Sequence, residues 1–219
     1  MIKLYHVPLS ANSRRVWIAL LEKGIAFEQV LLKLDGDQLQ PEFLAINPFH
    51  HIPVLEDDGF IVFESLAILD YLEAKYPTPP LLPTEPKAIA TVKMVEMVTV
   101  NELLPATIPL SAQAMGLANI NLQKLEAANQ KIVTVLKFFE SLLNDYPYLG
   151  SNTLTLADIV AGTLVPHLPF MGFPIDDYPK LNIWIEFLMS RDAWLKTQPT
   201  TEEIQAFLPQ AKAFIQDLI

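Results

Sequence analysis

Hydrophobic and polar positions change their spacing several times along the N-terminal part of the chain, and each change predicts a different element. Ile2 to His6 is a short apolar run typical of a strand. Apolar residues then recur at helical spacing from Val16 to Leu20, and Gly24 can cap the end of that helix. Phe27 to Leu32 predicts a second strand. Because one helix separates the two strands, we expect them to lie parallel, joined by a right-handed crossover.

The pattern continues with a short helix, a hairpin and a longer helix. Pro41 to Ile46 predicts the short helix. Val54 and Leu55 lead into an Asp-Gly turn that Phe60 to Phe63 follow, as in an antiparallel hairpin. A run that opens at Glu64-Ser65 repeats apolar residues at helical spacing as far as Tyr76. The order β-α-β-α-β-β-α is that of the thioredoxin-like fold.

A proline-rich segment separates this part from the rest. Five prolines within 77–86 are incompatible with a helix or a central strand. We therefore predict an α+β protein, with an N-terminal thioredoxin-like βαβαββα domain over 1–76, a linker over 77–86 and an all-helical C-terminal domain over 87–219.

Two hydrophobic stripes predict core-facing helices in the C-terminal part. The first stripe consists of Ala90, Met94, Met97 and Asn101, and Pro105 and Pro109 should kink or end its helix. The second consists of Leu125, Ile132, Leu136, Phe139 and Leu143. Further helices are expected over 178–190 and 202–218, with a break in the last one considered at Pro209.

Thr155-Leu-Ala-Asp158 has the form of a capping box at the start of another helix. The Thr155 hydroxyl would accept from the amide three residues on, and the Asp158 carboxylate would accept from the Thr155 amide. We assign this segment to stability and not to chemistry.

Composition and charge narrow the function classes. The 25 acidic against 15 basic residues give a net charge of −10, which disfavours nucleic acid and anionic membranes as partners. Without cysteine there is no disulfide or thiolate metal site, and the four histidines form no ligand pattern, so we expect no metal. The start MIKLYHV does not resemble a signal peptide, and prolines and amides interrupt the uncharged stretches 103–123 and 159–175, so we expect a cytoplasmic protein without membrane spans.

Candidate chemistry gathers around the predicted hairpin. The start of the helix after it suits a carboxylate ligand at Ser65, and Glu64 suits an ammonium group, although plain helix capping would explain both residues. In Ile52-Pro53, a cis proline at the head of a strand would expose backbone groups to a ligand's own peptide, whereas the trans form is the default for an arbitrary X-Pro bond.

Taken together, NP-x-x-x-IPVL, the hairpin and ES-x-A-I-x-x-YL resemble the glutathione-binding half of cytosolic glutathione transferases. The resemblance implies a glutathione transferase fold in which Pro53 is cis. It also implies that Ile52, Pro53 and Val54 meet the cysteinyl backbone of glutathione, and that Glu64 and Ser65 hold its γ-glutamyl end.

Ser10 is the residue that we expect to carry the chemistry. It lies in the turn before the first helix, whose free amides would stabilise a thiolate. The segment S-x-x-S-R-x-V resembles that of bacterial serine-type transferases of theta, delta or zeta kind, in which the matching serine donates a hydrogen bond to the glutathione sulfur. Asn12 could share that donation, and Ser13 is a more natural helix cap. Tyr5 is a weaker candidate, because by its offset from Pro8 it is His6 that falls where tyrosine-type transferases have their catalytic tyrosine. The alternative for Ser10 itself is an ordinary helix cap.

The resemblance also assigns residues to the glycine end of glutathione. Gln38 and His51 stand where the family often has residues that bind the glycine carboxylate, and the pair would form a clamp that strengthens when His51 is protonated. The alternative for His51 is a solvated loop residue. The electrophile is expected near Leu9.

The resemblance implies an enzyme that conjugates the thiolate of glutathione, its co-substrate, to small hydrophobic electrophiles in detoxification, as a homodimer. Two alternatives remain: a zeta-like isomerase of maleylacetoacetate type, weakened by Ala11 and Asn12 where that class has Ser-Cys, and a non-catalytic binding module.

Overall fold

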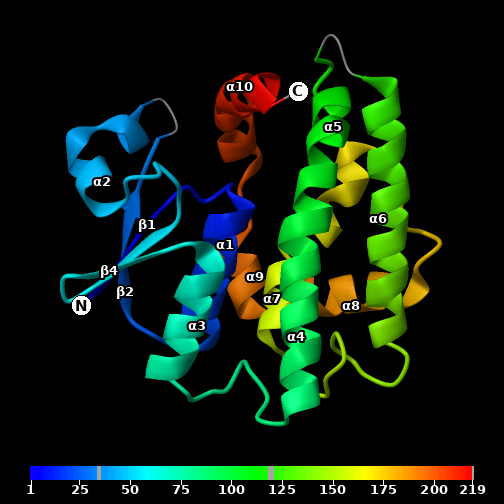
Figure 1. Ribbon diagram of the computed structural model, residues 1–219, viewed down its shortest axis with the longest axis horizontal. Coiled ribbons are helices and arrows are strands. Elements are labelled where there is room, and N and C mark those ends of the chain that lie inside the picture. The colour runs from blue at the N-terminus through cyan, green and yellow to red at the C-terminus, as the bar shows by residue number, and fades with distance from the viewer. Residues whose placement is uncertain (34–35, 118–120, 219) are drawn as a thin grey trace. The chain divides into compact units, whose positions relative to one another are not determined.

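The computed structural model describes residues 1–33, 36–117 and 121–218 (Figure 1). The chain divides into two compact units. The first unit comprises Met1–Leu81 together with Asp192–Gln205, and the second comprises Leu82–Arg191 with the residues from Ala206 onward. The division after Leu81 falls within the segment 77–86 that we propose as the linker.

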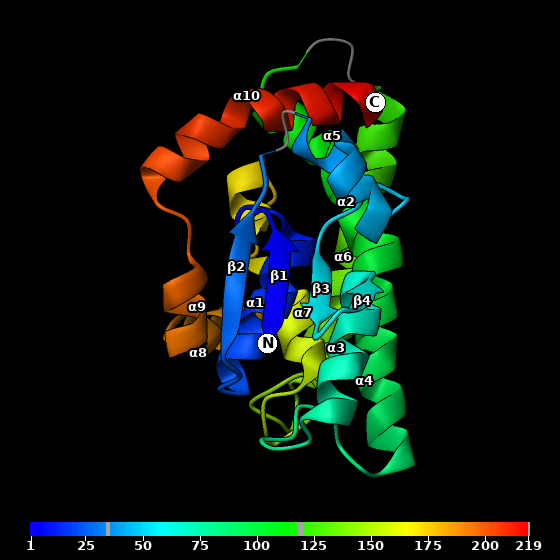
Figure 2. The same ribbon diagram turned by 90° about the vertical axis from the view of Figure 1, so that its left-hand side faces the viewer.

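The first unit contains one sheet of four strands, in the order β2-β1-β3-β4 (Figure 2). Its strands are β1 (Ile2–His6), β2 (Phe27–Leu31), β3 (Val54–Asp57) and β4 (Phe60–Phe63). β1 pairs with β2 in parallel and with β3 antiparallel, and β3 pairs with β4 antiparallel. The predicted parallel crossover and the predicted hairpin are both confirmed.

Helices follow three of the strands, and their ends carry the expected signals. α1 (Ala11–Glu22) begins after its Ser10 cap and ends before Gly24, whose φ of +63° suits glycine. After β2 come a 3₁₀ turn (Asp37–Leu39) and α2 (Pro41–Ile46), which has proline in its first turn. α3 (Ser65–Lys75) follows β4, and α9 (Asp192–Thr197) also belongs to this unit.

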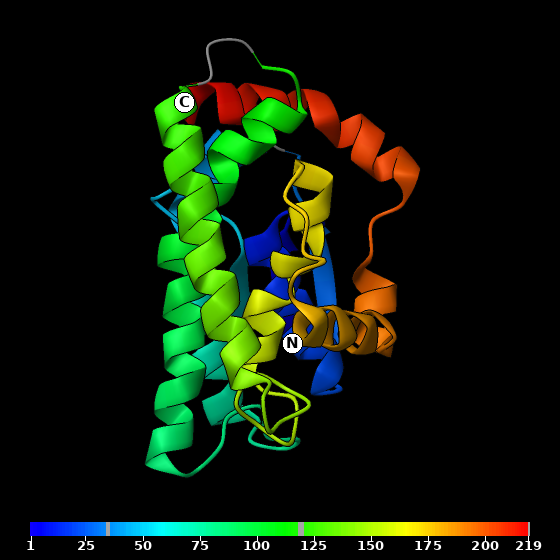
Figure 3. The same cartoon turned by 90° about the vertical axis from the view of Figure 1, so that its right-hand side faces the viewer.

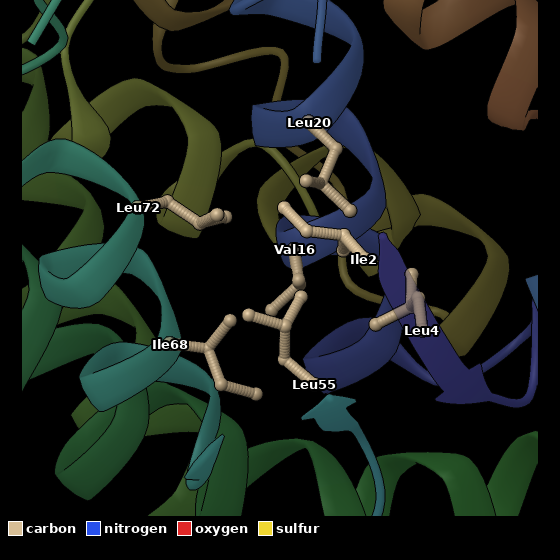
Figure 4. Close-up of a cluster of buried hydrophobic side chains, with 7 residues drawn as sticks. All are labelled: Ile2, Leu4, Val16, Leu20, Leu55, Ile68 and Leu72. Atoms are coloured by element: carbon tan, nitrogen blue, oxygen red, sulfur yellow. The ribbon is translucent and has the colours of Figure 1, made fainter. Parts of the chain in front are cut away.

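The core of this unit lies between the sheet and the pair α1 and α3 (Figure 4). It contains residues at alternate positions of β1, one residue of β3, and residues four apart on each helix: Ile2, Leu4, Leu55, Val16, Leu20, Ile68 and Leu72. All seven are at most 3% exposed. Burying one such side chain stabilises the fold by about 1.5–3 kcal/mol, so this cluster holds both helices on the same face of the sheet.

The strand directions bring three chain segments to one edge of the sheet. β3 runs opposite to both β1 and β4, so β1 and β4 run the same way. α1 and α3, which directly follow these two strands, therefore begin at the same edge. β3 starts there too, because Val54 pairs with Tyr5 near the end of β1 and with Phe63 at the end of β4.

Lys23 holds the segment that leaves α3. Its ammonium donates to the backbone carbonyls of Tyr76 at 2.8 Å and Pro79 at 2.9 Å, and it forms an ion pair with Glu73 at 2.6 Å. Glu73 in turn accepts from the Leu81 amide at 3.1 Å. The Lys23 side chain is fully buried, so a proline-rich segment that cannot form regular structure is secured by a charged side chain.

The second unit is helical (Figures 1 and 3). Its helices are α4 (Pro86–Val98), α5 (Leu104–Ala114), α6 (Leu122–Leu142), α7 (Leu156–Ala161) and α8 (Pro179–Met189). A π-helical turn (Thr99–Leu103) joins α4 to α5, and a 3₁₀ helix (Val165–Met171) follows α7. α10 (Thr201–Leu218) spans the division between the units. No helix in the described ranges is long and apolar enough to cross a membrane.

Prolines act differently at three places in these helices. Pro105 lies at the start of α5, directly after the π-helical turn, so the predicted interruption near it is confirmed. α5 continues through Pro109, and α10 continues through Pro209, where we considered a break. Pro109 and Pro209 each remove one backbone donor, but neither ends its helix.

The first hydrophobic stripe was assigned to the wrong face of its helix. Met94 and Met97 are 50% and 45% exposed, and Ala90 and Asn101 are exposed as well. The buried face of α4 carries Val92 and Val95 together with the polar Glu96, and the polar Thr99, at the start of the π-helical turn, is buried as well. Thr99 donates to the Val95 carbonyl at 2.7 Å, and Glu96 accepts from Lys93 at 2.9 Å. Polar residues therefore occupy part of the inner face of this helix. For that reason the positions of its apolar residues did not identify the buried face.

The second stripe is confirmed on α6. Ile132, Leu136 and Phe139 are fully buried, Leu143 is nearly so, and Leu125, the first residue of the stripe, is partly exposed. Its charged side carries Lys124, Lys131 and Lys137, all exposed. Here the apolar and charged positions segregate cleanly, which explains why the helical pattern identified the correct face.

The capping box at α7 is confirmed, and its aspartate does more than cap. The fully buried Asp158 carboxylate accepts from the amide and hydroxyl of Thr155, each at 2.9 Å. It also accepts from the Leu149 amide and from Trp184 Nε1, both at 2.9 Å. Burial raises the pKa of Asp158, while these four hydrogen bonds oppose that shift. One carboxylate thus joins the loop before α7, α7 itself and α8.

We expect Asp158→Ala to lower the free energy of unfolding by about 3–4 kcal/mol, because it leaves several buried donors without an acceptor. Urea denaturation measures the change. Asp145→Ala, at an exposed position, is the control and should change stability by at most about 0.5 kcal/mol. A loss of only about 1 kcal/mol in Asp158→Ala, as for an ordinary helix cap, would contradict the wider role.

We expect Lys23→Met to destabilise the first unit by about 3 kcal/mol, because Glu73 and two carbonyls lose a buried cation. Thermal melting gives the stability, and limited proteolysis shows whether residues 76–81 become accessible to cleavage. Lys33→Met, at an exposed position, should leave both unchanged. Equal behaviour of the two variants would show that Lys23 does not hold the segment.

Candidate functional site

The edge of the sheet described above gathers the residues that the sequence singled out. Ser10 lies between β1 and α1, and Pro53 directly precedes β3. Glu64 lies between β4 and α3. The N-termini of α1 and α3 thus lie at the same edge as the Ile52-Pro53 peptide bond. The first amides of each helix have no acceptor within their own helix. Such an edge is suited to an anionic ligand that has a peptide backbone.

Ser10 caps α1 and keeps its hydroxyl hydrogen for another partner. Its backbone is extended, with φ −73° and ψ 123°, and its Oγ accepts from the Ser13 amide at 3.4 Å. A hydroxyl that accepts through a lone pair can still donate its own hydrogen. Ser10 and its neighbours Leu9 and Asn12 are partly exposed. The cap role and a donor role are therefore compatible in one side chain.

Ser13 is fully buried and has a structural position. Its Oγ accepts from the Val7 amide at 3.4 Å, which closes the turn between β1 and α1. The expectation that Ser13 caps the helix is wrong, because Ser10 is the N-cap. Ser13 instead holds the turn before the helix, which leaves Ser10 as the hydroxyl at the site.

The Ile52-Pro53 peptide bond is cis, as predicted. Pro53 and Val54 are buried, and Ile52 is partly exposed. Val54 stands at the first position of β3, beside the turn that carries Ser10, because it pairs with Tyr5 of β1. A Thr78-Pro79 bond is also cis, which the sequence did not indicate.

Glu64 has a backbone conformation that is rare for a side-chain-bearing residue. Its φ is +68°, and its side chain makes no capping hydrogen bond to α3. Strained backbone of this kind is concentrated at functional sites. The Glu64 carboxylate is largely exposed, so plain capping does not explain this residue.

Ser65 is the first residue of α3 and is nearly buried, at 8% exposed. Its Oγ accepts from Arg15 Nη1 at 3.4 Å. The buried side chain of Arg15 therefore links the start of α3 to α1.

His51 lies beside Glu64. The distance from His51 Nδ1 to Glu64 Oε1 is 3.6 Å, and both side chains are about two-thirds exposed, at 69% and 65%. The His51 ring also lies near Phe49, with 6.5 Å between ring centres. Gln38 is partly exposed, and among the described residues its buried Oε1 has no hydrogen-bond partner. The structure brings His51 to Glu64, and no hydrogen bond between described residues links Gln38 to either.

Tyr5, the weaker candidate, and its neighbour His6 are both engaged away from the site. Tyr5 donates to Glu56 at 2.8 Å, and burial and Glu56 raise the pKa of Tyr5 to about 12. His6 is fully buried, with its Nε2 3.1 Å from Gln29 Oε1 and its ring 5.2 Å from that of Trp17. Burial lowers the pKa of His6, which keeps the imidazole neutral. Neither residue presents an acidic donor to the edge.

Sequence reasoning missed the two buried arginines of α1. Arg15 is 0% and Arg14 is 4% exposed. Burial lowers the pKa of Arg14 to about 10, so it still carries its charge at neutral pH. The local signals were their position between Ser13 and Val16 near the start of the helix, and the place of Arg14 in the S-x-x-S-R-x-V segment. Within the described ranges, no cluster of histidine and acidic residues could hold a metal ion.

Comparisons with known proteins agree with this geometry. The family model described as "Glutathione S-transferase, N-terminal domain" matches residues 4–80, and "Glutathione S-transferase, C-terminal domain" matches 72–192. Glutathione S-transferase D7 of Drosophila melanogaster is 30% identical, covering 99% of this chain and 94% of that protein. Glutathione S-transferase F13 of Arabidopsis thaliana is 34% identical, covering 90% of this chain and 95% of that protein.

Solved structures show the same fold. A delta-class glutathione transferase of Nilaparvata lugens matches with a TM-score of 0.81 and 27% identity, over 97% of this chain and 99% of that one. A glutathione transferase homologue from Sulfitobacter, solved with bound glutathione, matches with a TM-score of 0.76 and 25% identity, over 90% and 96%. The predicted thioredoxin-like domain and helical domain are thereby confirmed. With both family models matched and relatives similar over nearly its whole length, the chain belongs to the glutathione S-transferase family.

Proposed function

We propose that this protein, a glutathione transferase, uses the Ser10 hydroxyl to stabilise the glutathione thiolate and transfers its sulfur to small hydrophobic electrophiles. The observation that carries the proposal is the Ser10 cap. Its Oγ accepts from the Ser13 amide, which orients the hydroxyl at the start of α1 while its hydrogen remains able to donate to a sulfur. Helix N-termini lower thiol pKa values by the same electrostatics.

The chemical step needs few parts from the protein. The thiol loses its proton to solvent, and the thiolate, held by Ser10 and the first amides of α1, forms a bond to an electrophilic carbon. In an addition, the electron pair of the π bond that opens moves onto the acceptor, which is then protonated. In a substitution, the electron pair of the bond that breaks leaves with the displaced group. Proximity and a stabilised thiolate supply the rate. We propose that the electrophile binds near Leu9, the partly exposed apolar neighbour of Ser10.

The rest of glutathione is proposed to lie along the same edge. Glu64 would bind the γ-glutamyl ammonium, and Ser65 with the first amides of α3 would bind the γ-glutamyl carboxylate. The peptide of the cysteinyl residue would pair with the backbone at Val54, beside Ile52 and cis-Pro53. Gln38 and His51 are proposed to meet the glycine carboxylate.

We also propose a homodimer in the cytoplasm. The exposed face of α4, with Met94 and Met97, is an apolar surface that a second copy of the chain could cover. Interfaces are enriched in methionine, which adapts its shape to a partner. A cytoplasmic location suits an enzyme that consumes reduced glutathione.

We expect Ser10→Ala to lower kcat/KM for a general electrophile such as a chlorodinitrobenzene by about 10²-fold. This is the usual decrease in rate when one hydrogen-bond donor to a reacting anion is removed. Thiolate absorbance against pH should show the bound thiol ionising well below free glutathione in the wild type and near the free value in Ser10→Ala. Ser10→Thr, which keeps the hydroxyl, is the control and should retain most of the shift.

Other outcomes of the same experiment support the alternatives. Glutathione that binds with an unshifted thiol in the wild type, with no turnover, would support the non-catalytic module. Turnover of maleylacetone in preference to conjugation would support the isomerase.

We expect His51→Ala to lower the affinity for S-methylglutathione severalfold, because the ring N–H is proposed to donate to the glycine carboxylate. The methylated sulfur removes thiol ionisation from the measurement. The His51–Glu64 pair is exposed and worth little by itself, so the His51 ring remains available to the ligand. Calorimetric titration measures the affinity. Equal affinities of His51→Ala and the wild type would remove His51 from the site.

A further inference from the structure

Two neighbouring arginines lie buried in the first unit, which is an unusual arrangement. Arg14 and Arg15 both come from α1, and neither is more than 4% exposed. Charged side chains are almost never fully buried unless they are paired, and removing each from water costs several kcal/mol. The contacts that offset this cost therefore indicate what each arginine does.

The two guanidinium groups reach different parts of the unit, because successive residues of a helix point about 100° apart. Arg14 Nε donates to Thr197 Oγ1 of α9 at 3.3 Å. Arg15 Nη1 donates to Ser65 Oγ, at the start of α3, at 3.4 Å. Arg14 thus fastens a distant segment to α1, whereas Arg15 joins α1 to the candidate site.

The position of Arg15 links the two helix starts of that site. Arg15 lies in α1, five residues after its cap Ser10. It contacts Ser65, the first residue of α3, which directly follows Glu64. Ser10 and Ser65 are 55 residues apart in the chain and are proposed to hold two different ends of one ligand. Their separation must match that ligand, and small misplacements in such a constellation reduce rates strongly.

We propose that Arg15 is a positioning residue for glutathione activation, which holds Ser65 and the start of α3 at a defined place relative to Ser10. Its permanent positive charge, buried beneath the edge, also favours the anionic ligand. This inference rests on the proposed function of Ser10 and Ser65.

The test compares Arg15→Lys with Arg14→Lys, two adjacent buried arginines changed in the same way. Lysine keeps the charge and loses the planar fork that fixes a partner's position. We expect Arg15→Lys to lower kcat/KM for glutathione about tenfold and to move the bound-thiol ionisation toward that of free glutathione. Arg14→Lys should lose thermal stability and keep the wild-type thiol ionisation.

Thermal melting of both variants separates folding from positioning. Arg15→Met, which removes the buried charge at similar volume, serves if lysine is not tolerated, with the same expected changes. A double-mutant cycle adds a second readout, because Arg15→Lys should have a much smaller effect in the Ser65→Ala background than in the wild type.

Two outcomes would overturn the inference. Equal effects of Arg15→Lys and Arg14→Lys on thiol ionisation would mean that Arg15 only supports the fold, and additive effects with Ser65→Ala would mean that the two residues act separately. Either result leaves the proposed function intact when wild-type protein ionises bound glutathione. An unshifted thiol in the wild type would instead contradict the proposed function itself.

Discussion

The direction of the strands is the constraint on which the rest of this structure depends. β3 pairs antiparallel with both β1 and β4, so β1 and β4 must point the same way. Each is followed directly by a helix, and the shared core of Leu4, Val16, Leu55 and Ile68 keeps both helices on one face of the sheet. The two helix N-termini therefore begin at one edge. No local feature of Ser10 or Ser65 would bring them together without this pairing.

The electrostatics of that edge oppose those of the whole chain. The net charge is −10, whereas the edge presents two helix N-termini above the buried cation of Arg15. Exposed charges are screened by salt over about 8 Å, but partial charges at van der Waals distance in a partly buried site are screened much less. The local field should therefore dominate for a ligand that reaches the edge. An acidic chain can in this way provide a site for an anion.

Buried charges recur where irregular segments have to be held in place. Lys23 binds the carbonyls of the segment that leaves α3, and Asp158 binds the loop before α7 and the indole of α8. Arg15 does the same for the start of α3. In each case one charged side chain satisfies backbone or side-chain groups that regular hydrogen-bond ladders leave without partners. Each of these three residues joins segments that are distant in sequence or differ in conformation.

Local sequence by itself determined the elements and much of the site. The strands, α1, α2, the hairpin and the capping box at α7 follow from periodicity and cap residues, whose effects act within a few positions of the chain. Ser10, Pro53 and Glu64 could be found for the same reason, since each stands where a helix or a strand begins. Their roles toward glutathione came from the family resemblance and remain proposals.

Only the tertiary structure decided which partners those elements and residues meet. The inner face of α4 carries the polar Glu96, while Met94 faces outward, because packing against neighbouring helices selects a face that apolarity does not identify. Likewise the pairing of His51 with Glu64 and of Arg15 with Ser65 joins residues 13 and 50 positions apart. Such contacts arise from how the core places whole elements in space, and no pattern within a short stretch of sequence contains that information.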